Sequence, residues 1–387
     1  MVLSLTVYTV TALLMAWLGW HVSTREQRLI AGGGSQLPFL SWEIVAAICI
    51  YVLVSAVRWQ TSWDYNQYLS YYMSIQSLGE YSRENYEPGF HLISVAMARS
   101  GLHFAWFFGF WAAVHIILLY YALRHRKFLL PWVALCILLG PYYMQWMSIL
   151  RQAVVECLFV AMIELIIRRK FWLYLLVTAL ACTVHRMSVL FLPFYFVPLI
   201  PVRQSMRRWL PAVALVVCVL AGSFPQWIQW LFDQVGQWAQ LLGYERYYRL
   251  FSNDVAGYGF RYVMGPVRLC PLLLGGMLIW YYPQMHQHFA GTDPGFTAFY
   301  RFSIVYLCYA NLMANTTQYL TRPGDLLRAV FMVTVCYLMA YLYRERRWLP
   351  LVAACALTFY YIYYELFKAV TMPGSIYAPE VYHTFLF

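Results

Sequence analysis

The chain alternates between long apolar runs and short polar connections. A helix that spans a lipid bilayer needs about 20 predominantly apolar residues, and ten runs approach or reach this length. They predict spans over 2–21, 40–57, 103–123, 128–149, 151–167, 209–223, 262–282, 296–314, 326–343 and 348–367. No basic region precedes the first run and no small-residue cleavage site follows it, so we expect a retained helix and no signal peptide. The pattern predicts an all-α polytopic membrane protein with about 10 full spans, forming a single transmembrane domain over residues 1–387.

Two further apolar segments do not fit a simple span. The run 171–200 is long but is interrupted at Thr183–Arg186, which predicts a broken two-helix hairpin. The run 89–101 is too short to cross, and we expect a re-entrant or broken helix that enters from the outer face. Non-helical backbone at membrane depth is tolerated only inside protein or along a cavity. We therefore expect a cavity there.

Charge gives the chain its orientation. Only 11% of residues are charged and 62% are hydrophobic. The formal charge of +11 comes largely from short Lys/Arg clusters beside apolar runs, as the positive-inside rule expects of cytoplasmic loops. This places cytoplasmic loops near 22–39, 124–127, 168–170, 201–208, 283–295 and 344–347, outer loops at 58–88 and 224–261, and both termini outside. The basic charge therefore indicates membrane topology, and we expect no nucleic-acid partner.

Metal and cofactor motifs are missing from the sequence. All nine cysteines lie inside apolar segments, and there is no CxxC, DxD, HExxH or GxSxG pattern. Asp64, Glu84 and Glu87 are the nearest grouping of hard ligands, but outer-face arginines would compete with a cation. We expect no metal and no cofactor, and we interpret the cysteines as packing residues.

The unusual polar residues gather on the outer side in this topology. The stretch RENYEPGFH, residues 83–91, leads into the short helix, and Glu87 stands before Pro88-Gly89 at the membrane edge. Partial desolvation there raises a carboxyl pKa and suits a general base. Arg151 opens a helix whose N-terminus favours anions. This pattern predicts a site for a phosphate-bearing substrate at the outer face.

Structural roles are open for each of these residues. Glu84 and Glu87 would form surface ion pairs with Arg83 or Arg58, and Asp64 would be the N-cap of an interfacial helix. His185 would be a satisfied buried histidine. Two further carboxylates lie on one helix: Glu164 is expected to pair with Arg168, and Glu156 is a weaker candidate for the cavity.

Four motifs occur in order: DYNQY (64–68), YEPGF (86–90), RQAVVECLFVAMIE (151–164) and LACTVHRMSVLFLPFY (180–195). In this order the sequence resembles the EpsG-type branch of bacterial polysaccharide polymerases, the Wzy-like proteins. The closing IYAPEVYHTFLF resembles the aromatic tail of that family more loosely. The resemblance is best over about residues 50–200.

The resemblance implies a multi-pass, GT-C-like glycosyltransferase of the bacterial inner membrane, with its site facing the periplasm or exterior. It would polymerise undecaprenyl-pyrophosphate-linked oligosaccharide repeat units of an O-antigen or exopolysaccharide. Expected partners are this substrate, membrane lipids, a chain-length regulator (a polysaccharide co-polymerase) and a flippase.

Roles are assigned on this basis. The catalytic candidates are Glu87, Asp64 and His185. The pyrophosphate candidates are Arg151, Arg58, Arg322 and Arg328. The saccharide candidates are Tyr65, Tyr86, His91 and Gln152. The rival functions are a polysaccharide ligase, which differs mainly in its acceptor, and a lipid-linked oligosaccharide transporter, which would show charges through the midplane and an inverted repeat.

Overall fold

The structure is a computed structural model that describes residues 2–78, 86–201, 206, 208–224, 230, 234, 237, 265–316, 318–371 and 383–384. Apart from one isolated bridge between Arg58 and Thr384, all secondary structure in these residues is helical. The helices are α1 (Val2–Ala31), α2 (Trp42–Ala56), α3 (Tyr65–Leu78), α4 (Pro88–Arg99), α5 (Phe104–Ala122), η2 (Lys127–Leu129), α6 (Leu130–Leu139), α7 (Tyr142–Ser148), α8 (Leu150–Ile167), α9 (Phe171–Val184), η3 (Arg186–Leu190), α10 (Phe191–Phe194), η4 (Val197–Leu199), α11 (Trp209–Gly222), α15 (Pro266–Phe289), α16 (Phe296–Leu312), α17 (Gln318–Asp325), α18 (Arg328–Arg344) and α19 (Trp348–Thr371).

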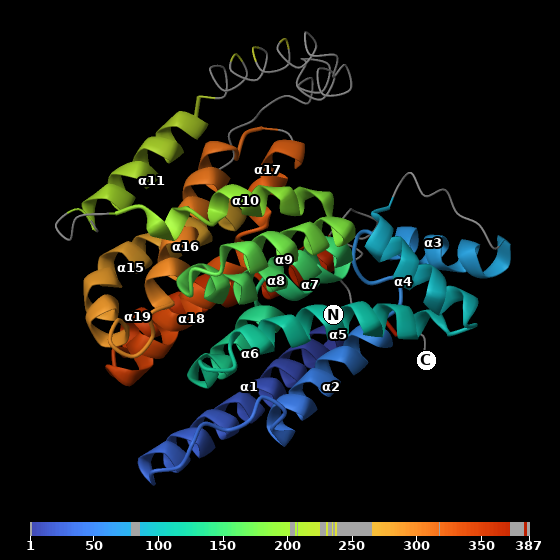
Figure 1. The fold of residues 1–387 in the computed structure, drawn as a ribbon, viewed down its shortest axis with the longest axis horizontal. Coiled ribbons are helices and arrows are strands. Elements are labelled where there is room, and N and C mark those ends of the chain that lie inside the picture. The colour runs from blue at the N-terminus through green and yellow to red at the C-terminus, as the bar shows by residue number, and fades with distance from the viewer. Residues whose placement is uncertain are drawn as a thin grey trace.

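The helices form two groups around a shared centre (Figure 1). Helices α1, α2, α5 and α6 pack together on one side, and α15, α16, α18 and α19 on the other. Helices α3 and α4 lie at one end of the molecule, where they build a second, aromatic-rich core with α5.

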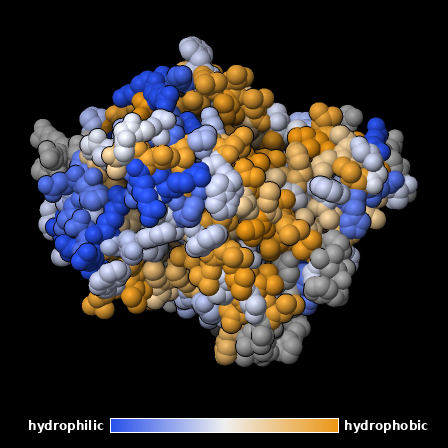
Figure 2. Space-filling model, turned by 90° about the horizontal axis from the view of Figure 1, so that it is seen from below, coloured by the Kyte–Doolittle hydropathy of each residue, from blue (hydrophilic) through white to orange (hydrophobic). Residues whose placement is uncertain are grey.

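In the part of the chain that the structure describes, two helices have the length and hydropathy expected of a membrane span, Leu3–Ala31 and Phe104–Ala122. A third span is possible if the bent pair Lys127–Leu139 and Tyr142–Ser148 is taken together. Several shorter apolar helices accompany them, including Trp42–Ala56 and Trp209–Gly222. Figure 2 shows hydrophobic residues over much of one face and hydrophilic residues gathered toward its left end. These apolar helices are those of a membrane protein, and the predicted count of about 10 full spans remains a prediction.

The two irregular segments are helical as expected. The hairpin breaks at His185, because α9 ends at Val184 and η3 begins at Arg186. The short helix at 89–101 corresponds to α4, Pro88–Arg99. The continuous span expected at 128–149 is wrong in detail, because the chain bends by 64° between α6 and α7, at Gly140-Pro141.

Helices α8 and α18 form the centre of the fold and give it two chemically different ends. Every residue of α18 from Arg328 to Leu342 is buried, which is typical of a helix that is apolar on all sides. Both helices run from a polar cavity at their N-termini to the basic clusters 168–170 and 344–347.

Three basic residues near this end, Arg126, Lys127 and Arg168, are paired with carboxylates. Arg126 donates two hydrogen bonds to Asp293, at 2.7 and 2.8 Å, and the Lys127 ammonium lies 2.6 Å from Glu26. Arg168 donates to Glu164 at 2.6 Å, which confirms that predicted pair. Because the charges within each of these pairs neutralise one another, we interpret the pairs as structural.

Candidate active site

A polar cavity of about 410 Å³ opens at the N-terminal ends of α8 and α18. Five segments contribute to its wall: the residues before α3, α7, the start of α8, α17 with the start of α18, and α19. Its lining residues are Trp63, Asp64, Met144, Gln145, Ser148, Ile149, Gln152, Arg322, Asp325, Arg328 and Tyr361. The structure therefore brings four residues singled out in the sequence, Asp64, Gln152, Arg322 and Arg328, to one cavity.

Asp64 is placed in the wall by a strained turn that docks on α7. Gln60 and Ser62 adopt positive φ angles of 49° and 87°, which non-glycine residues rarely do. The turn is held because the Ser62 hydroxyl donates to the Met147 carbonyl at 3.0 Å and the Trp63 amide donates to Ser148 Oγ at 3.1 Å. Backbone strain maintained by such contacts is common at functional sites.

Burial raises the pKa of the Asp64 carboxyl, while the positive charges of Arg322 and Arg151 partly offset that rise. Partial desolvation makes an ionised carboxylate a stronger base, and the two arginines favour its charged form. Asp64 therefore combines exposure to the cavity with the protonation behaviour of a general base.

Arg328 is the most deeply placed cation of the cavity. Its side chain is 10% exposed, forms an ion pair with Asp325 and donates a hydrogen bond of 2.5 Å to Gln145 Oε1. Asp325 is 27% exposed, so this pair still faces the cavity. Gln145 and Asp325 were not among the predicted site residues, since neither belongs to a motif of recognisable spacing.

A buried hydrogen-bonded unit behind the cavity wall fixes Gln152, which lines the cavity. Gln152 Nε2 donates to Glu156 Oε1 at 2.9 Å, and Trp146 Nε1 donates to Glu156 Oε2 at 3.0 Å. Glu156 is fully buried, so its carboxyl supports the wall and does not reach the cavity surface. Such a satisfied polar unit holds one rotamer of Gln152.

Glu87 and His185 form a neighbouring junction that ties three helices together. Glu87 precedes α4, its Oε2 accepts a short hydrogen bond from Arg151 on α8, and its Oε1 accepts one of 3.1 Å from the Arg186 amide at the start of η3. His185 Nδ1 lies 3.5 Å from Glu87 Oε1, within ion-pair range but too long for a strong hydrogen bond. The Arg151 guanidinium also lies over the Tyr86 ring, 4.9 Å from its centroid.

The expectation that the membrane edge raises the pKa of Glu87 is wrong. Desolvation does act in that direction, but His185, the Arg151 charge and the Arg186 amide outweigh it and lower the pKa to about 2. A carboxylate so strongly stabilised in its charged form is a poor proton acceptor. The role of this junction is therefore positioning, because Glu87 fixes Arg151 beside the cavity.

Gly89 is required by the close packing of this junction. A Cβ at Gly89 would lie 2.4 Å from Thr183 Oγ1 and 3.0 Å from the Thr183 carbonyl oxygen, so α4 and α9 would have to separate. We expect Gly89→Ala to cost about 1–3 kcal/mol, as overpacking does, and to lower the apparent Tm of the purified protein. Gly276→Ala in α15 is the matched control, because nothing lies within 4 Å of its Cβ. Equal Tm values for the two variants would contradict the packing argument.

The remaining predicted residues lie outside the cavity lining. Arg58 is fully buried, with its guanidinium 4.8 Å from the Phe108 ring centroid and a hydrogen bond to the Met147 carbonyl. Tyr65 stacks on Phe108, Tyr86 is 4% exposed, and His91 Nδ1 is hydrogen-bonded to Tyr71 at 2.8 Å.

The burial of Arg58, Tyr65 and Tyr86 argues against the contacts with substrate that the sequence predicted for them. The rings of Tyr65 and Tyr86 are covered by protein, so neither presents a face to a sugar. We therefore propose no substrate contact for Arg58, Tyr65, Tyr86 or His91. Arg83, Glu84 and most of the outer loop 224–261 lie outside the described residues.

The fold and the cavity together define a helical membrane protein with a charged site at one end of its central helices. Comparison with known families gives a match to the model described as "EpsG family" over residues 42–378. The match covers most of the chain, so the chain belongs to the EpsG family, and the resemblance noted in the sequence is confirmed. No curated protein and no solved structure matches the chain significantly. Family membership indicates a membrane protein of polysaccharide biosynthesis and is consistent with a glycosyltransferase-like polymerase.

Proposed function

We propose that this protein polymerises undecaprenyl-pyrophosphate-linked oligosaccharide repeat units at the outer face of the bacterial inner membrane. The observation that carries the proposal is the convergence of Asp64, Arg322 and Arg328 on one polar cavity of about 410 Å³. This volume falls within the usual range for small-molecule sites, roughly 300–1,000 Å³.

The position of the cavity supports an outer-face reaction. Helices α8 and α18 both lead from the cavity to basic clusters, at 168–170 and 344–347. The positive-inside rule places such clusters in the cytoplasm, so the cavity lies at the opposite membrane surface. A helix the length of α8 rises about 27 Å at 1.5 Å per residue, close to the hydrocarbon thickness.

The proposed reaction transfers the growing glycan to the incoming unit. Asp64 accepts the proton of the acceptor hydroxyl, whose oxygen attacks the anomeric carbon of the growing chain. A new glycosidic C–O bond forms while the anomeric C–O bond to pyrophosphate breaks. The polyprenyl pyrophosphate leaves with the electron pair, and Arg322 and Arg328 stabilise its developing negative charge.

Arginines perform here the role that a divalent cation performs in other pyrophosphate chemistry. We therefore propose a reaction without metal. The positive charge of Arg322, and after it that of Arg151, which Glu87 holds in place, favours the ionised form of Asp64. Gln152, fixed by Glu156, is the proposed hydrogen-bonding contact to the saccharide. A chain-length regulator and a flippase that delivers the substrate are the proposed partners.

The test is polymerisation by the purified protein in lipid nanodiscs. A synthetic undecaprenyl-pyrophosphate repeat unit is incubated with wild type and with Arg328→Gln, in the presence and absence of EDTA. We expect a ladder of products with wild type in both conditions and at least a hundredfold slower ladder with the variant, as when a transition-state donor is removed. Substrate binding without any ladder from the native repeat unit would instead favour a ligase or a transporter. Loss of the ladder in EDTA would overturn the metal-free reaction.

A further inference from the structure

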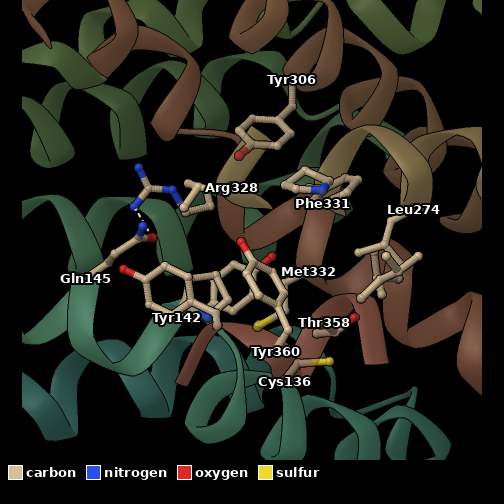
Figure 3. A pocket seen from close by; sticks show the side chains of 16 residues that line it. Cys136, Tyr142, Gln145, Leu274, Tyr306, Arg328, Phe331, Met332, Thr358 and Tyr360 are labelled. Atoms are coloured by element: carbon tan, nitrogen blue, oxygen red, sulfur yellow. Dashed lines mark hydrogen bonds between the residues drawn. The ribbon is translucent and has the colours of Figure 1, made fainter. Parts of the chain in front are cut away.

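A second, apolar cavity of about 90 Å³, drawn in Figure 3, shares lining residues with the polar one. Its wall comes from α6, α7, α15, α16, α18 and α19. Most of the side chains that line it are apolar or aromatic, among them Tyr142, Leu274, Phe331, Met332 and Leu357. Thr358 also lines it, but its hydroxyl donates to the Ala354 carbonyl at 2.8 Å within α19. The cavity therefore favours an apolar occupant.

The two cavities meet at Arg328. Three residues line both of them: Gln145, Arg328 and Tyr361. The hydrogen bond from Arg328 to Gln145, drawn in Figure 3, lies on this shared boundary. An anionic group held at Arg328 in the polar cavity thus has an apolar cavity immediately beside it.

The apolar cavity also reaches the surface of the helix bundle. Val267, at the start of α15, lines it and is 52% exposed. Leu273, two turns further along α15, is 46% exposed and faces away from the cavity lining. In a membrane protein, exposed apolar side chains on a helix face contact lipid. A chain that leaves the cavity past Val267 would therefore enter the hydrocarbon of the bilayer.

We propose that this cavity binds the first isoprene unit of a polyprenyl pyrophosphate, with the pyrophosphate at Arg328. The proposal rests on the proposed function and specifies how the carrier lipid is recognised. A cavity of 150 Å³ holds a benzene ring, so one of about 90 Å³ suits about one five-carbon unit and not a whole tail. The remaining units lie in the bilayer and contribute little to specificity. The affinity thus depends on the branched unit beside the pyrophosphate and does not depend on the length of the tail.

The first experiment needs no variant. Affinities of wild type in nanodiscs are compared for geranyl pyrophosphate, farnesyl pyrophosphate, n-octyl pyrophosphate and inorganic pyrophosphate. Geranyl and n-octyl chains have equal backbone length, and only the first carries methyl branches. We expect geranyl and farnesyl pyrophosphate to bind alike, and each about fourfold more tightly than n-octyl pyrophosphate, since the one methyl branch of the unit in the cavity contributes about 0.8 kcal/mol. Equal binding of branched and linear chains would overturn the proposal.

The second experiment compares two neighbouring leucines of α15. Leu274→Trp fills the cavity from the wall, whereas Leu273→Trp adds the same bulk on the exposed face. We expect Leu274→Trp to weaken geranyl pyrophosphate at least tenfold and to leave inorganic pyrophosphate unchanged, and Leu273→Trp to change neither. Unchanged inorganic pyrophosphate affinity also shows that the variant is folded. Equal effects of the two variants on geranyl pyrophosphate would overturn the proposal.

The outcomes separate this proposal from the proposed function. If wild type polymerises repeat units and binds inorganic pyrophosphate, yet branching and Leu274→Trp have no effect, the function stands and the isoprene site is wrong. If wild type binds neither inorganic nor prenyl pyrophosphate, the pyrophosphate site at Arg328 is wrong and both proposals fail.

Discussion

Replacing Asp64 by Asn is expected to lower the rate of polymerisation by about 10²–10⁴-fold, the usual contribution of a positioned general base. The amide keeps the size of the side chain and its place in the cavity wall but cannot accept the hydroxyl proton. Asp64→Glu should retain part of the rate because it keeps the carboxylate. The measurement is the initial rate of ladder formation together with the apparent Tm.

Asn66→Ala is the matched control, because this neighbour on α3 is exposed and does not line the cavity. The pH profile separates a base from a merely structural residue. Burial raises the pKa of Asp64 above 3.8, so the wild-type rate should fall at low pH with a midpoint above that value. This acidic limb should vanish in the residual activity of Asp64→Asn. A rate within a few-fold of wild type would exclude Asp64 as the base.

Hydropathy and local breaks determine what the sequence could predict of the fold. The apolar runs correspond to helices such as α2, α5 and α11, and the interruption at His185 is the observed end of α9. The bend between α6 and α7 was missed because the run 128–149 was assigned by its hydropathy, which carries no information on direction. Gly140-Pro141 is the signal in the sequence that marks the bend. That bend turns Gln145 and Ser148 toward the cavity, so missing it also hid part of the site.

The site was predicted in part because motif residues near one membrane surface tend to converge. Asp64, Gln152, Arg322 and Arg328 do line one cavity. The sequence could not show that Tyr65 and Tyr86, unlike these four residues, are covered by protein. The burial of the two tyrosines arises from the packing of α3 and α4 against α5. Similarly, desolvation of Glu87 is readable from Pro88-Gly89, but the groups that outweigh it come from α8 and η3. Groups from other helices therefore lower the pKa of Glu87, although its local sequence suggested a raised one.

Removing Glu87 is expected to have the largest effect on stability. Its carboxyl is 7% exposed and its partner Arg151 is 23% exposed, so Glu87→Ala leaves a largely buried guanidinium without its carboxylate. Breaking a buried pair in this way costs about 3–5 kcal/mol, and the partial exposure of Arg151 favours the lower value. The double variant Glu87→Ala, Arg151→Met should recover much of this loss, because no buried charge is left unpaired. The measurement is unfolding in detergent by heat or denaturant for wild type, both single variants and the double variant.

The matched control is Arg168→Ala, which removes the pair with Glu164 at the basic end. Arg168 is 53% exposed, so this loss should be within about 0.5 kcal/mol. The pH dependence has a fixed sign, because the folded pKa of Glu87, about 2, is lower than its ordinary value of 4.5. Its contribution is therefore complete above pH 4.5 and is lost as the pH falls toward 2. Wild type should lose its stability advantage over Glu87→Gln in that window and keep it unchanged between pH 5 and 8. An advantage that changed between pH 5 and 8, and still did so in a background that carries His185→Gln, would mean that Glu87 titrates there. The residue would then again be a candidate for the base.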